Sequence, residues 1–262
     1  MNTIDLEDFI KIDNDYKDKK ISLCIGVFDG IHLGHQEILN KVTKNDFFSV
    51  VITFNRNPKM QSGRRVDEKP LLTKELQSMT FEKMGFDLEV IIDFSRKISK
   101  LSADEFLQIL CKNLDIYELV VGEDFQLGNP KKSLRSFELQ ENINRYSSKT
   151  KVVITKAIID SDNKVISSTR IRQLIKLGKM DVVQILLGRE YLLDLGSTPS
   201  QVFGNSLLIK TENIKQLIPN KGSFIGFWVE EKLKATVEIE AEVIKISPFP
   251  KSSDKFNILA LS

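Results

Sequence analysis

The chain has 262 residues, of which 41% are hydrophobic, and its 38 basic and 36 acidic residues leave a formal net charge of +2. This length accommodates one large domain, or one domain with a smaller appendage, and the apolar content is that of an ordinary globular core. The near-neutral balance excludes the broad basic field with which proteins bind duplex nucleic acid, so we expect no nucleic-acid partner.

The two cysteines, Cys24 and Cys111, show no CxxC spacing, which is typical of a reducing compartment and not of a disulfide framework. The first twenty residues are charged and contain no apolar segment of the signal-peptide kind. No apolar run reaches the roughly 18 residues that a membrane span requires. We therefore expect a cytoplasmic protein without a membrane partner.

The first pronounced pattern occupies residues 21–42. It predicts a buried strand over 21–25, a tight turn over 26–30 and an amphipathic helix from His32. Glycines in the turn let main-chain amides approach a ligand, and the helix N-terminus offers unpaired N–H groups and a positive dipole end. His32 and His35, the only histidines in the chain, share one helix face at that end. This stretch predicts a nucleotide-phosphate site; zinc ligation is the weaker alternative, because no third ligand is near in sequence.

Strand and helix patterns then alternate along the chain. Strands are predicted at residues 47–54, 88–94, 118–121 and 152–159, and helices at 73–85, 102–110, 134–145 and 170–177. This alternation predicts an α/β fold with a doubly wound parallel sheet, in which ligands bind beyond the carboxyl ends of the strands. The turns at 26–30, 55–58 and 122–128 all follow strands, so we expect them to converge on one crevice.

The segment Ser167-Ser168-Thr169 has the composition of a helix N-cap and precedes the helix predicted at residues 170–177. A plain capped helix is the simplest interpretation. Arg170 in the first turn opposes the helix dipole, however, and therefore predicts an anion nearby.

The chain changes character after Gly188. A Gly/Ser/Pro-rich start is followed by strand candidates at residues 207–209, 224–229 and 235–246, which predict a small antiparallel β unit. We therefore predict two domains, residues 1–188 and residues 189–262.

Several segments resemble motifs of one family, the bacterial bifunctional riboflavin kinase/FMN adenylyltransferases (FAD synthetases) of the HxGH nucleotidyltransferase superfamily. GVFDGIHLGH at residues 26–35 resembles the signature G-x-F-D-G-x-H-x-G-H, and SSTRIR at 167–172 is similar to S-S-T-x-I-R. VVGEDFQLG at 120–128 is similar to the flavin-side loop V-V-G-x-D-F-x-F-G, with Leu127 in place of Phe. TFNRNP at 53–58 is similar to T-F-x-P-H-P, with Asn57 in place of His. The resemblance covers about residues 20–190.

The resemblance implies a Rossmann-like nucleotidyltransferase domain that transfers AMP from ATP to FMN, giving FAD and pyrophosphate, with Mg²⁺ accompanying ATP. Three residues would stabilise the reacting phosphates: His32, His35 and Arg172. The ATP pocket would be shaped by Gly26, Phe28, Asp29, Gly30 and Gly34, and the phosphates would be clamped by Ser168 and Thr169 together with Arg172. Asn57, Asp124 and Phe125 would lie on the flavin side, and no side chain is expected to ligate a metal.

In this family a β-barrel riboflavin kinase domain with a G-F-P-T-A-N motif follows the first domain. Here residues 188–191 match the junction, but no P-T-A-N occurs, and Phe203-Gly204-Asn205-Ser206 is the nearest remnant. We predict a degenerate kinase-like barrel that has lost its activity and is retained for packing or for homo-oligomer contact. Three alternatives stay open: a bifunctional enzyme, another HxGH adenylyl- or cytidylyltransferase, and a flavin or nucleotide sensor without turnover.

Overall fold

The structure is a computed structural model that describes residues 1–9, 16, 18–55, 69–93, 100–129, 132–196, 198–250 and 258–262. It divides the chain into two compact units. Unit 1 comprises Met1–Phe28, Gly34–Asp67 and Ser78–Ile158, and unit 2 comprises Asp29–Leu33, Glu68–Gln77 and Ile159–Ser262.

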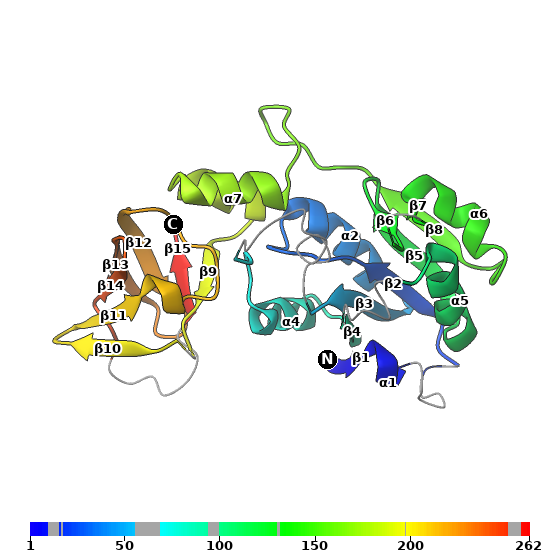
Figure 1. The fold of residues 1–262 in the computed structure, drawn as a ribbon, viewed down its shortest axis with the longest axis horizontal. Helices are drawn as coiled ribbons and strands as arrows, with labels where there is room; N and C mark the ends of the chain where they lie inside the picture. The colour runs from blue at the N-terminus through cyan, green and yellow to red at the C-terminus, as the bar shows by residue number, and fades with distance from the viewer. Residues whose placement is uncertain are drawn as a thin grey trace. The chain divides into compact units, whose positions relative to one another are not determined.

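Unit 1 is built on a parallel sheet whose strand order is β1-β4-β3-β2-β5-β8. The strands are β1 (Asn2–Asp5), β2 (Ile21–Ile25), β3 (Phe48–Phe54), β4 (Leu88–Ile92), β5 (Ile116–Gly122) and β8 (Lys151–Thr155). The chain proceeds from β2 to β3 and β4 on one side, and β5 and β8 lie on the other (Figure 1). This order confirms the predicted doubly wound α/β sheet and places its topological switch point between β2 and β5, where ligands of such folds bind.

The helices and short elements of this part of the chain follow the predicted alternation. They are α1 (Leu6–Phe9), α2 (Leu33–Thr43), α4 (Lys74–Lys83), α5 (Ala103–Asn113), η2 (Ser136–Glu138) and α6 (Leu139–Ile143), with a two-stranded ribbon of β6 (Gln126–Leu127) and β7 (Leu134–Arg135). The prediction of a helix over residues 134–145 is wrong in its first part. Leu134 and Arg135 pair with β6 instead, and Leu134 packs against the apolar core, so pairing overrides the local helical pattern.

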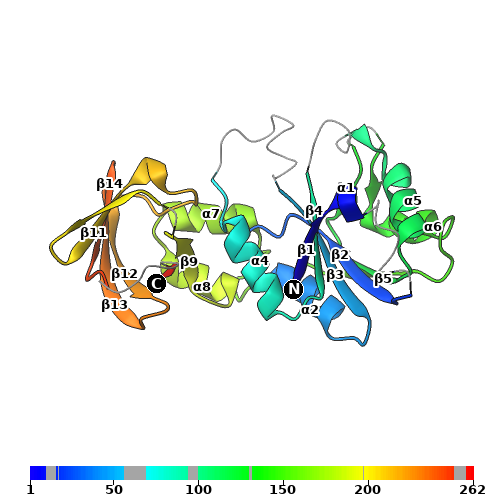
Figure 2. The same cartoon turned by 90° about the horizontal axis from the view of Figure 1, so that it is seen from below.

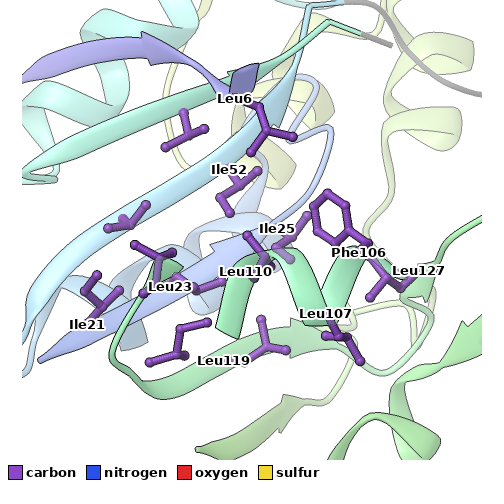
Figure 3. Packing of buried hydrophobic residues seen from close by; sticks show 14 of the residues in the cluster. Leu6, Ile21, Leu23, Ile25, Ile52, Phe106, Leu107, Leu110, Leu119 and Leu127 are labelled. Atoms are coloured by element: carbon purple, nitrogen blue, oxygen red, sulfur yellow. The ribbon is translucent and has the colours of Figure 1, made fainter. Parts of the chain in front are cut away.

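One apolar cluster of unit 1 lies on one face of its sheet. Alternate residues of β2, namely Ile21, Leu23 and Ile25, point into it, and α5 covers it with Phe106, Leu107 and Leu110 (Figure 3). The start of α5 is fixed by a capping box: the Ser102 Oγ accepts from the Glu105 N–H at 3.2 Å, and the Glu105 carboxylate accepts from the Ser102 N–H at 2.7 Å. Such a cap contributes about 1 kcal/mol to helix stability.

Unit 2 combines an antiparallel sheet with two helices, α7 (Ser168–Lys176) and α8 (Met180–Leu187). The strands, in the order β10-β11-β14-β13-β12-β15-β9, curl around a core that contains the fully buried Trp228 (Figure 2). They are β9 (Tyr191–Asp194), β10 (Ser200–Phe203), β11 (Ser206–Lys210), β12 (Gly222–Trp228), β13 (Leu233–Ile239), β14 (Val243–Ser247) and β15 (Ile258–Leu261), and η3 (Thr211–Asn213) follows β11. The predicted antiparallel β unit is therefore confirmed.

The two structural units do not separate at residue 188, where the sequence predicts the domain boundary. Unit 2 takes up residues 68–77, because hydrogen bonds attach this strap to later parts of the chain. The Leu217 N–H donates to the Pro70 carbonyl at 2.9 Å, and the Thr73 hydroxyl donates to the Asp194 carboxylate at 2.9 Å. The assignment of separate functions to residues 1–188 and 189–262 stays a prediction. Within the described residues, no helix is both long and apolar enough to span a membrane.

Candidate nucleotide-binding site

The turn after β2 has a strained backbone. Phe28 and Ile31 adopt positive φ angles of 47° and 42°, and Gly30 adopts 86°. A β-branched residue such as Ile31 rarely enters this region, at a cost of roughly 1–3 kcal/mol. A side chain at Gly30 would also bring a Cβ within 2.8 Å of the Leu71 Cδ1 atom. Strain of this kind persists where the surrounding structure holds it, which is typical of functional sites.

In unit 1, Phe28 connects the turn to the helix that follows. Its ring folds back against Gly26, where an added Cβ would lie 2.8 Å from the ring. The same ring meets His35 edge-on, with centroids 5.5 Å apart at 85°, and Phe81 at 6.0 Å and 84°. His35, in the first turn of α2, is therefore held in place by an aromatic contact, and Gly26 leaves the room for it.

His32 directly precedes α2 and is only 6% exposed. Burial lowers the pKa of its imidazole from the ordinary 6.5 to about 4. The side chain is therefore neutral at pH 7 and can donate one hydrogen bond to an anion. Positive potential at this place comes from the helix N-terminus and from arginines, and not from an imidazolium.

In unit 2, the backbone and carboxylate of Asp29 are held from several sides. The Arg172 guanidinium forms an ion pair with the Asp29 carboxylate. The Leu71 N–H donates to the same carboxylate at 2.8 Å, and the Ser168 hydroxyl donates to the Asp29 carbonyl at 2.9 Å. The Arg189 guanidinium donates to the next carbonyl, that of Gly30, at 2.8 Å. The strap, α7 and the segment before β9 therefore fix the conformation of the turn together.

The N-terminus of α7 has the predicted cap, but it changes the interpretation of Arg170. Ser167 is the N-cap residue, and its hydroxyl accepts from the Arg170 N–H at 3.3 Å. The anion that Arg170 predicts is the carboxylate of Asp160, with which it forms an ion pair. The hydrogen bond that the Arg170 guanidinium donates within this pair holds the pKa of Asp160 below its ordinary value. Arg170 therefore gives no argument for a bound phosphate.

The structure brings three predicted site residues of unit 2 together: Asp29, Ser168 and Arg172. Arg172 is only 4% exposed and lies against Asp29, so the free protein already supplies one anion to this guanidinium. Ser168 uses its hydroxyl for the Asp29 carbonyl, whereas Thr169 is exposed in the first turn of α7. Their roles toward phosphate stay predictions.

The predicted flavin-side residues belong to unit 1. Gly122 ends β5, where a Cβ would lie 3.5 Å from the Ile38 Cδ1 atom, and Asp124 is exposed just beyond it. Phe125 is half-buried against the apolar core, and Leu127 is buried in it. Asn57 lies outside the described residues. At position 127, where the family pattern has Phe, this chain therefore has a buried leucine of the core and not an exposed flavin contact.

Two residues that contact or surround the turn were not predicted as site residues, Arg189 and Tyr191. Tyr191 is fully buried, and its hydroxyl donates to the Leu217 carbonyl at 2.7 Å. Burial, and next the charge of Asp29, raise the pKa of Tyr191. A signal was present in the sequence, because an arginine stands two positions before a tyrosine at the start of an apolar strand.

Comparisons with known proteins point to one family. A family model described as FAD synthetase matches residues 14–170. A bifunctional riboflavin kinase/FMN adenylyltransferase from Buchnera aphidicola subsp. Schizaphis graminum is 29% identical over 198 residues, which are 74% of this chain and 62% of that protein. An FAD synthetase from Listeria monocytogenes is 27% identical over 177 residues, 64% of this chain and 69% of that protein.

A solved structure described as a macrolide-efflux protein from Streptococcus pneumoniae covers 100% of this chain and 89% of its own, with a TM-score of 0.79. At 22% sequence identity this likeness shows the fold alone. The chain spans less than two thirds of the length of the Buchnera relative. The family model, in contrast, covers more than half of the chain, including the turn after β2 and the start of α7. The chain therefore belongs to the FAD synthetase family.

Proposed function

We propose that the chain transfers the AMP moiety of ATP to FMN, forming FAD and releasing pyrophosphate. Membership of the FAD synthetase family supports this reaction. The observation that carries it is the turn with strained residues Phe28 and Ile31, whose Asp29 and Gly30 carbonyls unit 2 holds directly before His32 and the start of α2. A fixed turn at the N-terminus of a helix is a preformed anion site, and ATP and FMN both present phosphates.

The proposed reaction requires the protein mainly to position the two substrates, and no catalytic base. An oxygen of the FMN phosphate attacks the α-phosphorus of ATP in line, a new P–O bond forms, and the bond to the β-phosphate oxygen breaks. The nucleophile is already anionic, so no base has to remove a proton. Negative charge grows on the α-phosphate oxygens and on the departing pyrophosphate, where the imidazoles and the α2 amides can donate hydrogen bonds.

Mg²⁺ belongs to this proposal as a companion of the triphosphate. In nucleotide-transferring sites it is held largely by phosphate oxygens and water, with few protein ligands. Within the described part of the chain, no group of three or more His, Cys, Asp or Glu side chains could hold a metal ion. We expect the ion to enter with ATP, where it supplies positive charge to the leaving group.

We further propose that the β sheet of unit 2 does not phosphorylate riboflavin. The absence of P-T-A-N from the sequence supports this proposal. The names of the relatives differ in whether they include riboflavin kinase. The Buchnera protein is described with both activities, and the Listeria protein as an FAD synthetase. A bifunctional enzyme is therefore the main alternative.

One assay separates these functions. The protein is incubated with Mg-ATP and either FMN or riboflavin, and the products are resolved by chromatography while pyrophosphate is measured. We expect FAD and pyrophosphate from FMN, and no FMN from riboflavin. FMN formed from riboflavin would establish the bifunctional alternative. Pyrophosphate released only with other phosphorylated acceptors would indicate a different nucleotidyltransferase, and tight binding of ATP and FMN without product would indicate a sensor.

A further inference from the structure

We propose that Arg189 is a positioning residue for the nucleotide phosphates, acting through the turn that precedes α2. This inference rests on the proposed function and adds to it a residue to which the family resemblance assigned no role. The Arg189 guanidinium donates to the Gly30 carbonyl at 2.8 Å and to the Glu190 carbonyl at 2.9 Å. Arg189 therefore ties the segment between α8 and β9 to the turn, across 159 positions of sequence.

The backbone places Arg189 firmly. It follows Gly188, which ends α8 in the left-handed conformation at φ 67°, and it precedes β9, which begins at the buried Tyr191. A helix end and a core strand thus fix the backbone on both sides of the side chain. Two hydrogen bonds from one planar guanidinium then fix its direction.

The hydrogen bond matters because the turn is strained. The Ser168 hydroxyl and the Arg189 guanidinium hold two consecutive carbonyls, those of Asp29 and Gly30. Directly after them, Ile31 keeps a positive φ of 42°. Without a donor on the Gly30 carbonyl, we expect the strained turn to relax, and the amides that lead into α2 would lose their common direction.

The charge of Arg189 adds to this effect. Arg172 is paired with Asp29, whereas Arg189 forms no ion pair within the described residues and donates only to main-chain carbonyls. An arginine side chain stays protonated in proteins, and partial burial limits screening by salt. The turn therefore has a nearby positive charge that no described carboxylate neutralises, and a polyphosphate would complement it.

Two substitutions separate the charge from the geometry. Arg189→Lys keeps the charge but replaces the fork with a single ammonium, and Arg189→Gln removes the charge and keeps an amide donor. Arg145→Gln is the matched control, because Arg145 lies in unit 1 and is exposed. Thermal unfolding checks each variant, and if Arg189→Gln does not fold, Arg189→Lys carries the test alone.

Hydrogen exchange tests the geometry in the nucleotide-free protein. We expect amides of residues 29–33 to exchange at least about tenfold faster in Arg189→Gln, and to a smaller extent in Arg189→Lys, while those of β3 stay unchanged. Calorimetry with Mg²⁺ and α,β-methylene ATP tests the consequence. We expect binding of this unreactive analogue to weaken about ten- to a hundredfold, because a small displacement of positioning groups has effects of this size. The KM for FMN should stay within about twofold, which a general loss of structure would not achieve.

Unchanged exchange at residues 29–33 would overturn the inference, and so would faster exchange with unaltered binding of the analogue. A wild-type protein that binds the analogue but forms no FAD would contradict the proposed function alone, since exchange and binding still measure the effect of Arg189. Equal effects in Arg145→Gln would also contradict the inference.

Discussion

The carboxylate of Asp29 and the guanidinium of Arg172 form an ion pair between residues 143 positions apart, with side chains that are 11% and 5% exposed. The pair joins the turn after β2 to the second turn of α7. Both residues belong to motifs that the sequence suggests independently, and the structure shows that these motifs are coupled in the free protein. A nucleotide bound at the proposed site would meet a guanidinium that already has a carboxylate partner.

We expect Asp29→Asn to destabilise the protein by about 3 kcal/mol, because it leaves the Arg172 charge in a site with little solvent and no carboxylate. Urea denaturation measures the change. Asp162→Asn is the control, since the Asp162–Lys164 pair is exposed, and its loss should cost less than about 0.5 kcal/mol. Equal costs in the two variants would show that burial of the Asp29 pair has no energetic consequence.

His32→Ala should lower the turnover of FAD formation about a hundredfold or more, as expected for the loss of one donor in the transition state. The imidazole lies directly before α2 and does not belong to the apolar cluster beneath α5. Steady-state kinetics with FMN and Mg-ATP measure the effect, and circular dichroism shows whether the fold is kept. Unfolding of the variant would indicate a structural histidine.

The stability of the protein should fall as the pH decreases from about 6.5 to 4. The pKa of His32 is lowered by burial to about 4, against an ordinary value of 6.5, so the unfolded chain takes up the proton first. The contribution of His32 is complete above pH 6.5 and decreases toward pH 4, by about 3 kcal/mol in total. Urea denaturation at several pH values should show a flatter profile for His32→Asn, and parallel profiles would contradict the prediction.

Gly128→Ala should destabilise the protein considerably more than Gly85→Ala. Both glycines adopt positive φ, 88° and 84°, but a Cβ at Gly128 would lie 2.4 Å from the Ala103 nitrogen, whereas nothing lies within 4 Å at Gly85. We expect Gly85→Ala to cost about 1 kcal/mol from its backbone conformation, and Gly128→Ala at least about twice as much. Chemical denaturation gives both values, and equal values would mean that the loop moves away from α5 without cost.

Five of the six described strands of the unit 1 sheet could be predicted from the sequence because they are short apolar runs, whereas the mostly polar edge strand β1 was not predicted. The predicted and observed bounds of β2 are the same, residues 21–25. In unit 2, the single strand predicted at residues 235–246 is two strands, β13 and β14. The Glu240 N–H closes the turn between them on the Val243 carbonyl at 2.9 Å, and this turn lacks the glycine or proline that would have marked it.

The candidate site could be predicted only as a set of motifs. Their spacing shows which residues belong to a turn or a helix start, but not which distant group each one contacts. The position of Arg170 at a helix start predicted an anion, and the anion is Asp160 of the same unit. Arg189 was missed because the match of residues 188–191 to the family junction does not show that its guanidinium contacts the distant Gly30 carbonyl.

Residues 29–33 and 68–77 belong to the same compact unit as residues 159–262, although they come much earlier in the chain. A truncation at residue 188 would therefore delete Arg189, together with Asp194 and Leu217, to which the strap is hydrogen-bonded. Such a truncation would disturb the turn and the strap, which lie before the cut, in addition to removing residues 189–262. Residues beyond position 188 therefore stabilise the turn that precedes α2, whatever activity the β sheet of unit 2 has of its own.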